Sequence, residues 1–129
     1  MGENINGGMQ MFSKILQRIV EETGGGVGSV LMGYDGIAVD QFFQPDEEID
    51  LQMVVVEYSN VLKEIRKTAE ILSLGEMEEI SIRTDRFIIV IRMLNDEYFV
   101  ALVINHDGNF GKARYLMTRE GYNLIEALG

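Results

Sequence analysis

The sequence predicts an α+β sandwich: one α/β domain with a single five-stranded antiparallel sheet and helices on both faces. Three segments have apolar residues at steps of three and four, the spacing that places side chains on one face of an α-helix. Five shorter segments are strand-like, and two of them, residues 86–94 and 98–105, are almost continuously apolar. Strands of that kind are typical of a sheet covered on both faces. The predicted order is α-β-β-α-β-β-β-α.

Composition indicates a globular domain and excludes several classes of site. The chain has 129 residues, is 47% hydrophobic and 25% charged, and carries a formal net charge of −10. This acidic balance argues against binding a nucleic-acid backbone, which needs clustered Lys and Arg. With no cysteine and one histidine, thiolate and His-rich metal sites lack their ligands, so we expect no metal and no cofactor. No apolar run is long enough for membrane insertion, and a cytoplasmic location is expected.

The N-terminal third predicts a helix followed by a β-hairpin. Residues 1–8 are polar and glycine-rich and are expected to form a flexible leader, so that the folded domain spans residues 9–129. A helix is predicted over 9–23. The triple glycine 24–26 ends it, and a helix-to-strand turn is preferred over a phosphate loop because no Gly-Lys-Ser/Thr follows. Strands are predicted at 27–34 and 37–44, joined by Asp-Gly, a dipeptide typical of hairpin turns.

The longest helix, predicted over residues 49–74, carries more apolar surface than one face requires. A first stripe is expected to close the sheet: Leu51, Val54, Val55, Tyr58, Val61, Leu62, Ile65, Ala69 and Leu72. Ile49, Met53 and Val56 form a second ridge, which either packs on the N-terminal helix or a loop, or marks an interface. Four polar residues continue that ridge: Asn60, Lys63, Glu64 and Lys67. They are either a solvated face or the polar rim of a partner-binding surface.

Three strands and a helix complete the chain. Strand 78–84 alternates, with Ile80 and Ile82 on one face, and is expected at an edge of the sheet, available for pairing with another chain. Because the following turns are short, strands 78–84, 86–94 and 98–105 are predicted to form an antiparallel meander. The final helix is predicted over 109–128, with Asp107 or Asn109 as its N-cap.

No catalytic constellation stands out in the sequence. Four arginines are candidates for an arginine finger: Arg66, Arg83, Arg86 and Arg92. Arg86, in the turn beside Asp85, comes nearest, but a surface charge is the preferred interpretation. His106-Asp107 has no nucleophile or second base nearby in the sequence, so a turn before a helix cap is preferred over an acid–base pair. We assign no catalytic residue and expect a protein that is not an enzyme.

The ordered set of motifs resembles the roadblock superfamily, which includes the dynein roadblock light chains and the bacterial MglB-type regulators. The matching stretches are VGSVLMGYDGIAVDQF, ISIRTDRFIIVIRMLNDEYFVALVIN and the helix opening NFGKAR. The resemblance implies a roadblock/profilin-like fold and a homodimer in which central helices pair and sheets join edge to edge. The implied dimer interface is Ile49, Met53, Val56, Ile80 and Ile82.

The resemblance also implies a function without catalysis. Such a dimer is a platform that binds a small Ras-like GTPase of the MglA type, as an MglB-type activator or a scaffold, with Asn60, Lys63, Glu64 and Lys67 as the partner-binding residues. A C-terminal extension found in certain MglB-type proteins does not follow Gly129 in this sequence, which leaves activation and scaffolding both open. The alternative is a small-molecule-sensing profilin- or PAS-like domain, with a pocket near Phe42, Phe87 and Phe99.

Overall fold

A computed structural model describes residues 2–45 and 50–129, with side chains from residue 11 onward except at positions 51 and 52. The predicted order of elements is confirmed. Its helices and strands are α1 (Gly2–Thr23), β1 (Gly26–Gly33), β2 (Ala38–Phe43), α2 (Leu51–Ile71), β3 (Glu79–Arg83), β4 (Phe87–Met93), β5 (Tyr98–Asn105) and α3 (Phe110–Leu128).

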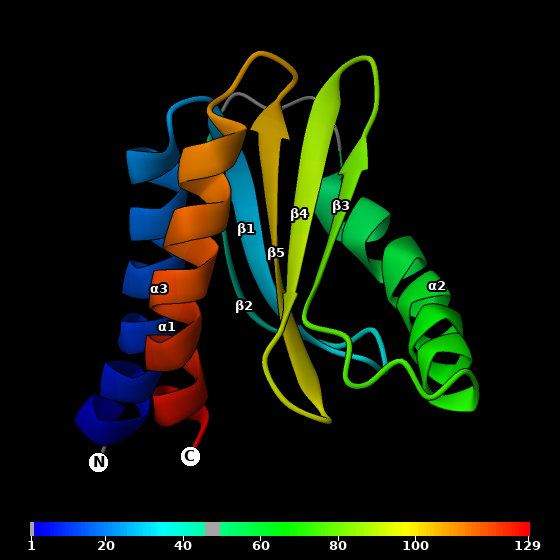
Figure 1. Ribbon diagram of the computed structural model, residues 1–129. Coiled ribbons are helices and arrows are strands. Elements are labelled where there is room, and N and C mark those ends of the chain that lie inside the picture. Colours follow the sequence, from blue (N-terminus) through cyan, green and yellow to red (C-terminus); the bar gives the residue numbers. More distant parts are fainter. Residues whose placement is uncertain (1, 46–49) are drawn as a thin grey trace.

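The five strands form one antiparallel sheet in the order β2-β1-β5-β4-β3. α1 and α3 lie side by side on one face, and α2 lies on the other (Figure 1). The two strands with continuous apolar runs, β4 and β5, are inside the sheet, because only a strand covered on both faces can bury such a run. The strands β2 and β3 are left at the edges.

Two hydrophobic cores sit on opposite faces of the sheet, and alternate residues of β4 enter each of them. Ile88 and Val90 pack under α1 and α3, whereas Ile89 and Ile91 pack on the α2 side. We call these the α1–α3 core and the α2 core. The period-2 geometry of a strand produces this division. Among the described helices, none combines the length and apolarity needed to cross a bilayer.

The first helix is longer than predicted. α1 begins at Gly2 rather than at Met9, so the backbone of residues 2–8 continues the helix. Extending an existing helix needs no new nucleation, and glycines near its end therefore do not stop it. The division into a leader and a domain from residue 9 stays a prediction.

The triple glycine forms the predicted helix-to-strand turn and also contacts the other end of the chain. Gly24 and Gly25 have φ values of +81° and +86°, which favour glycine. Their carbonyl groups accept hydrogen bonds from the Asn109 and Asn105 N–H groups at 3.1 and 2.8 Å. The turn between α1 and β1 is thus bonded directly to the turn between β5 and α3.

Replacing Gly26 by alanine is expected to destabilise the protein by about 3 kcal/mol or more, because a Cβ there would overlap the Val20 carbonyl oxygen and the backbone would have to move. Urea unfolding followed by circular dichroism measures the change. Gly121→Ala is the matched control. It lies inside α3, its Cβ would meet Leu94 at an ordinary 3.7 Å, and it should stabilise the protein by about 0.8–1 kcal/mol. Equal effects of the two substitutions would contradict this account of Gly26.

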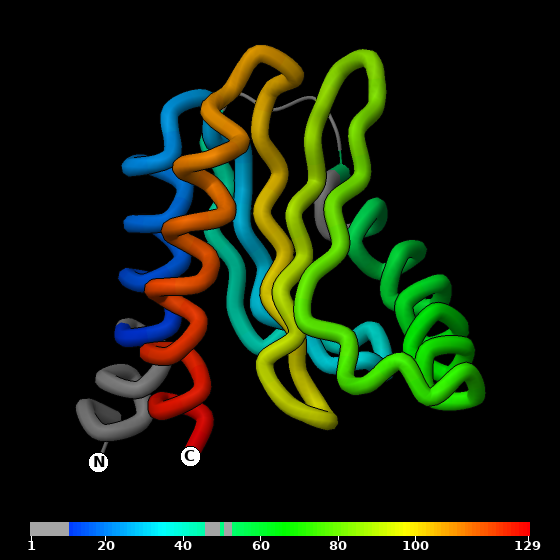
Figure 2. Tube along the Cα trace, viewed as in Figure 1, coloured from blue at the N-terminus to red at the C-terminus, as the bar shows by residue number. Residues whose placement is uncertain are grey.

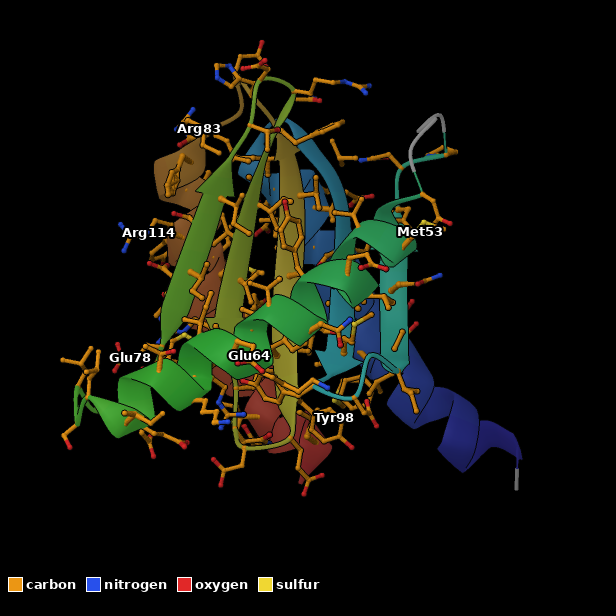
Figure 3. All side chains as sticks on the ribbon, turned by 90° about the vertical axis from the view of Figure 1, so that its right-hand side faces the viewer. Met53, Glu64, Glu78, Arg83, Tyr98 and Arg114 are labelled. Carbon is orange, nitrogen blue, oxygen red and sulfur yellow. The ribbon has the colours of Figure 1, made fainter. Side chains whose placement is uncertain are left out.

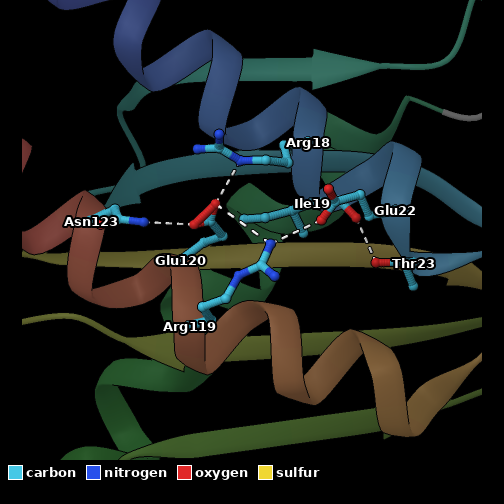
Figure 4. Close-up of polar contacts among 7 residues, drawn as sticks. All are labelled: Arg18, Ile19, Glu22, Thr23, Arg119, Glu120 and Asn123. Atoms are coloured by element: carbon cyan, nitrogen blue, oxygen red, sulfur yellow. Dashed lines mark hydrogen bonds and ion pairs between the residues drawn. The ribbon is translucent and has the colours of Figure 1, made fainter.

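A buried carboxylate joins α1 to α3. Glu120 is 2% exposed, and its Oε1 lies 2.6 Å from Nε of Arg18 on α1. Its other oxygen accepts a hydrogen bond from Asn123 at 2.7 Å, and Arg119 lies 3.9 Å away (Figure 4). Arg119 itself pairs with Glu22 on α1 at 2.9 Å. The two helices are therefore held by polar contacts as well as by the α1–α3 core.

The free edge of β2 is irregular. Its pairing with β1 shifts register between Leu31 and Met32, which is the signature of a β-bulge. The Gln41 N–H donates to the carboxylate of Asp40 at 2.8 Å instead of to a strand. The Asp40 side chain thus binds a backbone N–H group of this edge that another strand would otherwise use.

Candidate functional site

The path of α2 across the sheet decides which of its side chains are available. Asp50 caps the helix, with its carboxylate accepting a hydrogen bond from the Met53 N–H at 3.0 Å. Val55, Ser59 and Leu62 are buried against the sheet. Beyond them α2 diverges from the sheet (Figures 1 and 2), since a straight helix contacts a twisted surface only near their crossing point.

Part of the stripe that was predicted to close the sheet is therefore exposed, and that prediction is wrong for three residues. Val61, Ile65 and Leu72 are 49%, 39% and 60% exposed. They lie about 100° around the helix axis from the buried line, on the same side as the half-buried Val54 and Tyr58. We call these five residues the apolar stripe.

The apolar stripe borders a part of the sheet that no helix covers. On the opposite flank of α2, Val56 and Ser59 lie near Gly36 in the β1–β2 turn. Figure 3 shows α2 crossing the face obliquely, with the upper part of β3 and β4 uncovered. Ile82 and Phe87 in that part are half-buried. The helix and the two strands together expose one apolar region.

The predicted second ridge does not form a single free surface. Ile49 lies outside the described residues. Met53 is 60% exposed on the solvent side of α2 (Figure 3), whereas Val56 packs against the α2 core. The helical spacing predicted one shared surface for these residues, but the way in which α2 crosses the sheet exposes Met53 and buries part of Val56. Their role in a dimer stays a prediction.

The strand β3 lies at an edge of the sheet, as predicted. Ile80 and Ile82 are half-buried and pack against the α2 core. On the other face, Arg114 of α3 makes three hydrogen bonds to Glu79 at 2.8–3.0 Å, and these bonds raise the pKa of Arg114. Arg114 is the arginine of the NFGKAR motif, so this motif fastens the edge strand to α3.

The four predicted partner-binding residues are exposed on α2: Asn60, Lys63, Glu64 and Lys67. None of their side chains makes an ion pair with the described residues. They form a polar surface on the side of α2 away from the apolar stripe. The structure therefore keeps them available for a partner without assigning one.

One solved structure similar to this chain is MglC from Myxococcus xanthus, at 34% sequence identity, 90% coverage of this chain, 98% coverage of that chain and a TM-score of 0.66. The chain belongs to the roadblock superfamily. The MglB gliding protein from Thermus thermophilus has the same fold at 14% identity, covering 93% of this chain and 90% of that chain with a TM-score of 0.83. A Roadblock/LC7 domain from Streptomyces avermitilis matches at 13% identity, 90% and 96% coverage, and a TM-score of 0.78.

These likenesses come from solved structures alone. No family model and no curated protein matches the sequence. The strongest sequence identity among the relatives named above is to an MglC, whereas the resemblance found in the sequence motifs was to the MglB-type branch.

Three of the four arginine-finger candidates of this roadblock domain lie against aromatic rings, and the fourth, Arg92, lies near Gly121 of α3. The Arg66 guanidinium stacks 4.3 Å from the centre of the Tyr34 ring, and the Arg83 guanidinium lies 5.9 Å from that of Phe110. Arg86, the nearest candidate for a finger, is exposed and lies 5.2 Å from its neighbouring Phe87 ring. His106 and Asp107 are exposed in the turn before α3, whose N-cap is Asn109. Within the described residues, no cluster of His, Cys, Asp and Glu is arranged to hold a metal.

The alternative of a ligand pocket among three phenylalanines is not favoured. Phe42 packs on the α1–α3 core, whereas Phe87 and Phe99 belong to the α2 core on the opposite face of the sheet. Phe99 is fully buried, and its ring centre lies 5.3 Å from that of Tyr34 with the two rings tilted by 46°. The three rings therefore cannot line one cavity.

Proposed function

We propose that this roadblock protein is a homodimeric, non-enzymatic platform that binds a small Ras-like GTPase of the MglA type and regulates its nucleotide state. Its role is that of an activator or a scaffold. One observation carries the proposal: the apolar stripe of α2 is exposed beside β3, whose outer edge has no partner strand among the described residues. Membership of the roadblock superfamily supports a GTPase as the partner.

A second copy of the chain fits the apolar stripe and the edge strand together. Antiparallel pairing of β3 with β3 about a two-fold axis satisfies the free backbone groups of both edges. The same axis brings the two α2 helices side by side and removes both stripes from water. Ile80 and Ile82 stay in this interface, as the sequence predicted, while Val61 and Ile65 take the place of Met53 and Val56.

The polar face of α2 is the proposed surface for the GTPase. Once the two stripes pair, the faces with Lys63 and Lys67 lie on the outer side of the dimer. These lysines stand about one helical turn apart and, with Glu64 beside them, present two positive charges and one negative charge on a protein with a net charge of −10. Complementary charges at such a rim steer association and select the partner.

The double variant Lys63→Glu/Lys67→Glu should remain a dimer but bind the GTPase at least about tenfold more weakly, because two attractive charges become repulsive. Isothermal titration calorimetry measures the affinity. The matched control is Lys14→Glu/Lys112→Glu, which changes the net charge equally at exposed positions on α1 and α3. Equal weakening by both double variants would show only a general charge effect and would contradict the assigned surface.

The function itself is tested with the Ras-like GTPase encoded in the same genome, loaded with GTP or with GDP. We expect a complex that co-elutes with a dimer of the 14.6 kDa chain. Activation adds a faster rate of GTP hydrolysis, whereas scaffolding gives the complex with an unchanged rate. A monomeric protein, or a dimer that binds neither nucleotide form, would refute the proposal.

A further inference from the structure

A pocket of about 490 Å³ lies where α2 has diverged from the sheet. Its walls come from the C-terminal half of α2 and the loop after it, the segment entering β3, and the β4–β5 turn. Tyr34, just after β1, also lines it. No residue of the apolar stripe is among the lining residues. The pocket is therefore separate from the surface proposed for dimerisation.

Negative charge exceeds positive charge in this pocket. Four carboxylates line it, Glu70, Glu76, Glu78 and Asp96, against two guanidinium groups. The three glutamates make no ion pair with any described residue.

The two arginines do not neutralise those glutamates. Arg66 stacks on the Tyr34 ring and lies 3.5 Å from Asp96. Side chains alternate between the two faces of a strand, so Arg92 lies on the same face of β4 as Ile88 and Val90. That face is the one covered by α3. The pocket thus has room and charge for a cation.

The hydroxyl group of Tyr34 has no hydrogen-bond partner. The residue is 7% exposed, and its Oη is buried and unpaired. Burial raises the pKa of this phenol, the charge of Arg66 opposes that rise, and Asp96 adds to it. The group is therefore a neutral phenol at pH 7, able both to accept and to donate a hydrogen bond. Buried polar groups are normally paired, and Tyr34 lines the pocket, so a donor that enters the pocket is a candidate partner for its hydroxyl group.

The loop that forms one wall combines backbone strain with exposed apolar side chains. Ser73 has a φ of +55°, a conformation that is unfavourable for residues other than glycine and is concentrated at functional sites. On either side of it, Ile71 and Leu74 are 71% and 73% exposed. Exposed apolar side chains thus stand next in sequence to Ser73 and Gly75, which line the acidic pocket.

We propose that this pocket binds an arginine side chain of a partner protein, presented on a segment with apolar residues beside it. The planar guanidinium carries five N–H donors, enough to pair with both Glu76 and Glu78 and to leave a further donor for the hydroxyl group of Tyr34. The neighbouring apolar residues pack on Ile71 and Leu74. One protomer supplies every lining residue, so binding does not depend on the proposed dimer.

The test is an NMR titration of the ¹⁵N-labelled protein with acetyl-Leu-Arg-Leu-amide, and with acetyl-Leu-Glu-Leu-amide as the charge-reversed control. The arginine peptide should give saturable shifts at Tyr34 and over residues 70–78 and 95–97, which weaken with added salt. The glutamate peptide should give none. No saturable shift with the arginine peptide, or equal shifts with both peptides, would overturn the proposal. Agmatine binding as tightly as the arginine peptide would also overturn it, because the site would then recognise a free cation.

Variants locate the site. Glu76→Gln/Glu78→Gln should weaken binding of the arginine peptide about tenfold, since two charge-assisted hydrogen bonds are lost. The control Glu57→Gln/Glu126→Gln makes the same charge change at exposed positions outside the pocket and should bind normally.

Tyr34→Phe should weaken binding while leaving the free protein at least as stable, because it removes an unpaired buried group. Val61→Glu, in the apolar stripe, should bind the peptide unchanged, which separates this proposal from the dimer.

Discussion

Replacing Val61 and Ile65 together by glutamate is expected to convert the proposed dimer into a monomer. Both side chains lie in the apolar stripe, and pairing of α2 with α2 would bury the two new carboxylates without partners. A loss of about 4 kcal/mol or more corresponds to weakening self-association about a thousandfold. Sedimentation velocity over a range of concentrations measures it against the 14.6 kDa mass of one chain.

The matched control for this experiment is Met53→Glu. Met53 is on the same helix and 60% exposed, but it lies outside the apolar stripe, so this variant should remain dimeric. All three positions are solvent-accessible in one protomer, and circular dichroism should therefore show unchanged folding. A dimer lost with Met53→Glu but kept with Val61→Glu/Ile65→Glu would return the interface to the ridge predicted from the sequence.

Replacing Arg18 by methionine is expected to lower the free energy of unfolding by about 2–4 kcal/mol. The Glu120 side chain is 3% exposed, and Arg18 is its closest cationic partner, whereas the Arg18 side chain is 45% exposed. The variant thus leaves a buried charge with weaker compensation, which costs more than losing an exposed pair. Urea unfolding at pH 7 measures this change.

A second substitution shows whether the unpaired charge is the cause. In Arg18→Met/Glu120→Leu the buried carboxylate is gone, and most of the lost stability should return. Arg119→Met breaks the half-exposed pair with Glu22 and only a 3.9 Å contact with Glu120, so it should cost clearly less stability than Arg18→Met. A double variant as unstable as Arg18→Met would mean that the packing of the Arg18 stem matters more than the charge.

The fold was predictable because its signals are local. Steps of three and four separate helices from the alternating or continuous strands, and the Asp35-Gly36 and 95–97 turns fix antiparallel neighbours. The position of β3 at an edge also followed from its single apolar face. The start of α1 at Gly2 was missed, because propensity alone undervalues the extension of a helix that tertiary contacts already stabilise.

The candidate site was only partly predictable. The helical spacing placed Val61 and Leu62 on one apolar stripe, but it does not tell which side of the helix faces the sheet or where the helix crosses it. Leu62 is on the line of α2 that faces the sheet and is 2% exposed, whereas Val61 lies about 100° around the helix axis and is 49% exposed. The pair of Arg18 with Glu120 and the contact of Arg66 with Tyr34 join residues far apart in the chain, and no pattern along the sequence marks them.

The irregular edge of β2 limits how far such sheets can grow. If two protomers join through β3, the combined sheet ends in β2 on both sides. There the Asp40 carboxylate already holds the Gln41 N–H, and the register shift at Leu31 and Met32 disturbs the geometry that a further strand would need. Edge-to-edge growth of the proposed dimer would then be hindered at both ends. We therefore expect pairing through β3 to stop at two protomers and not to propagate into a filament.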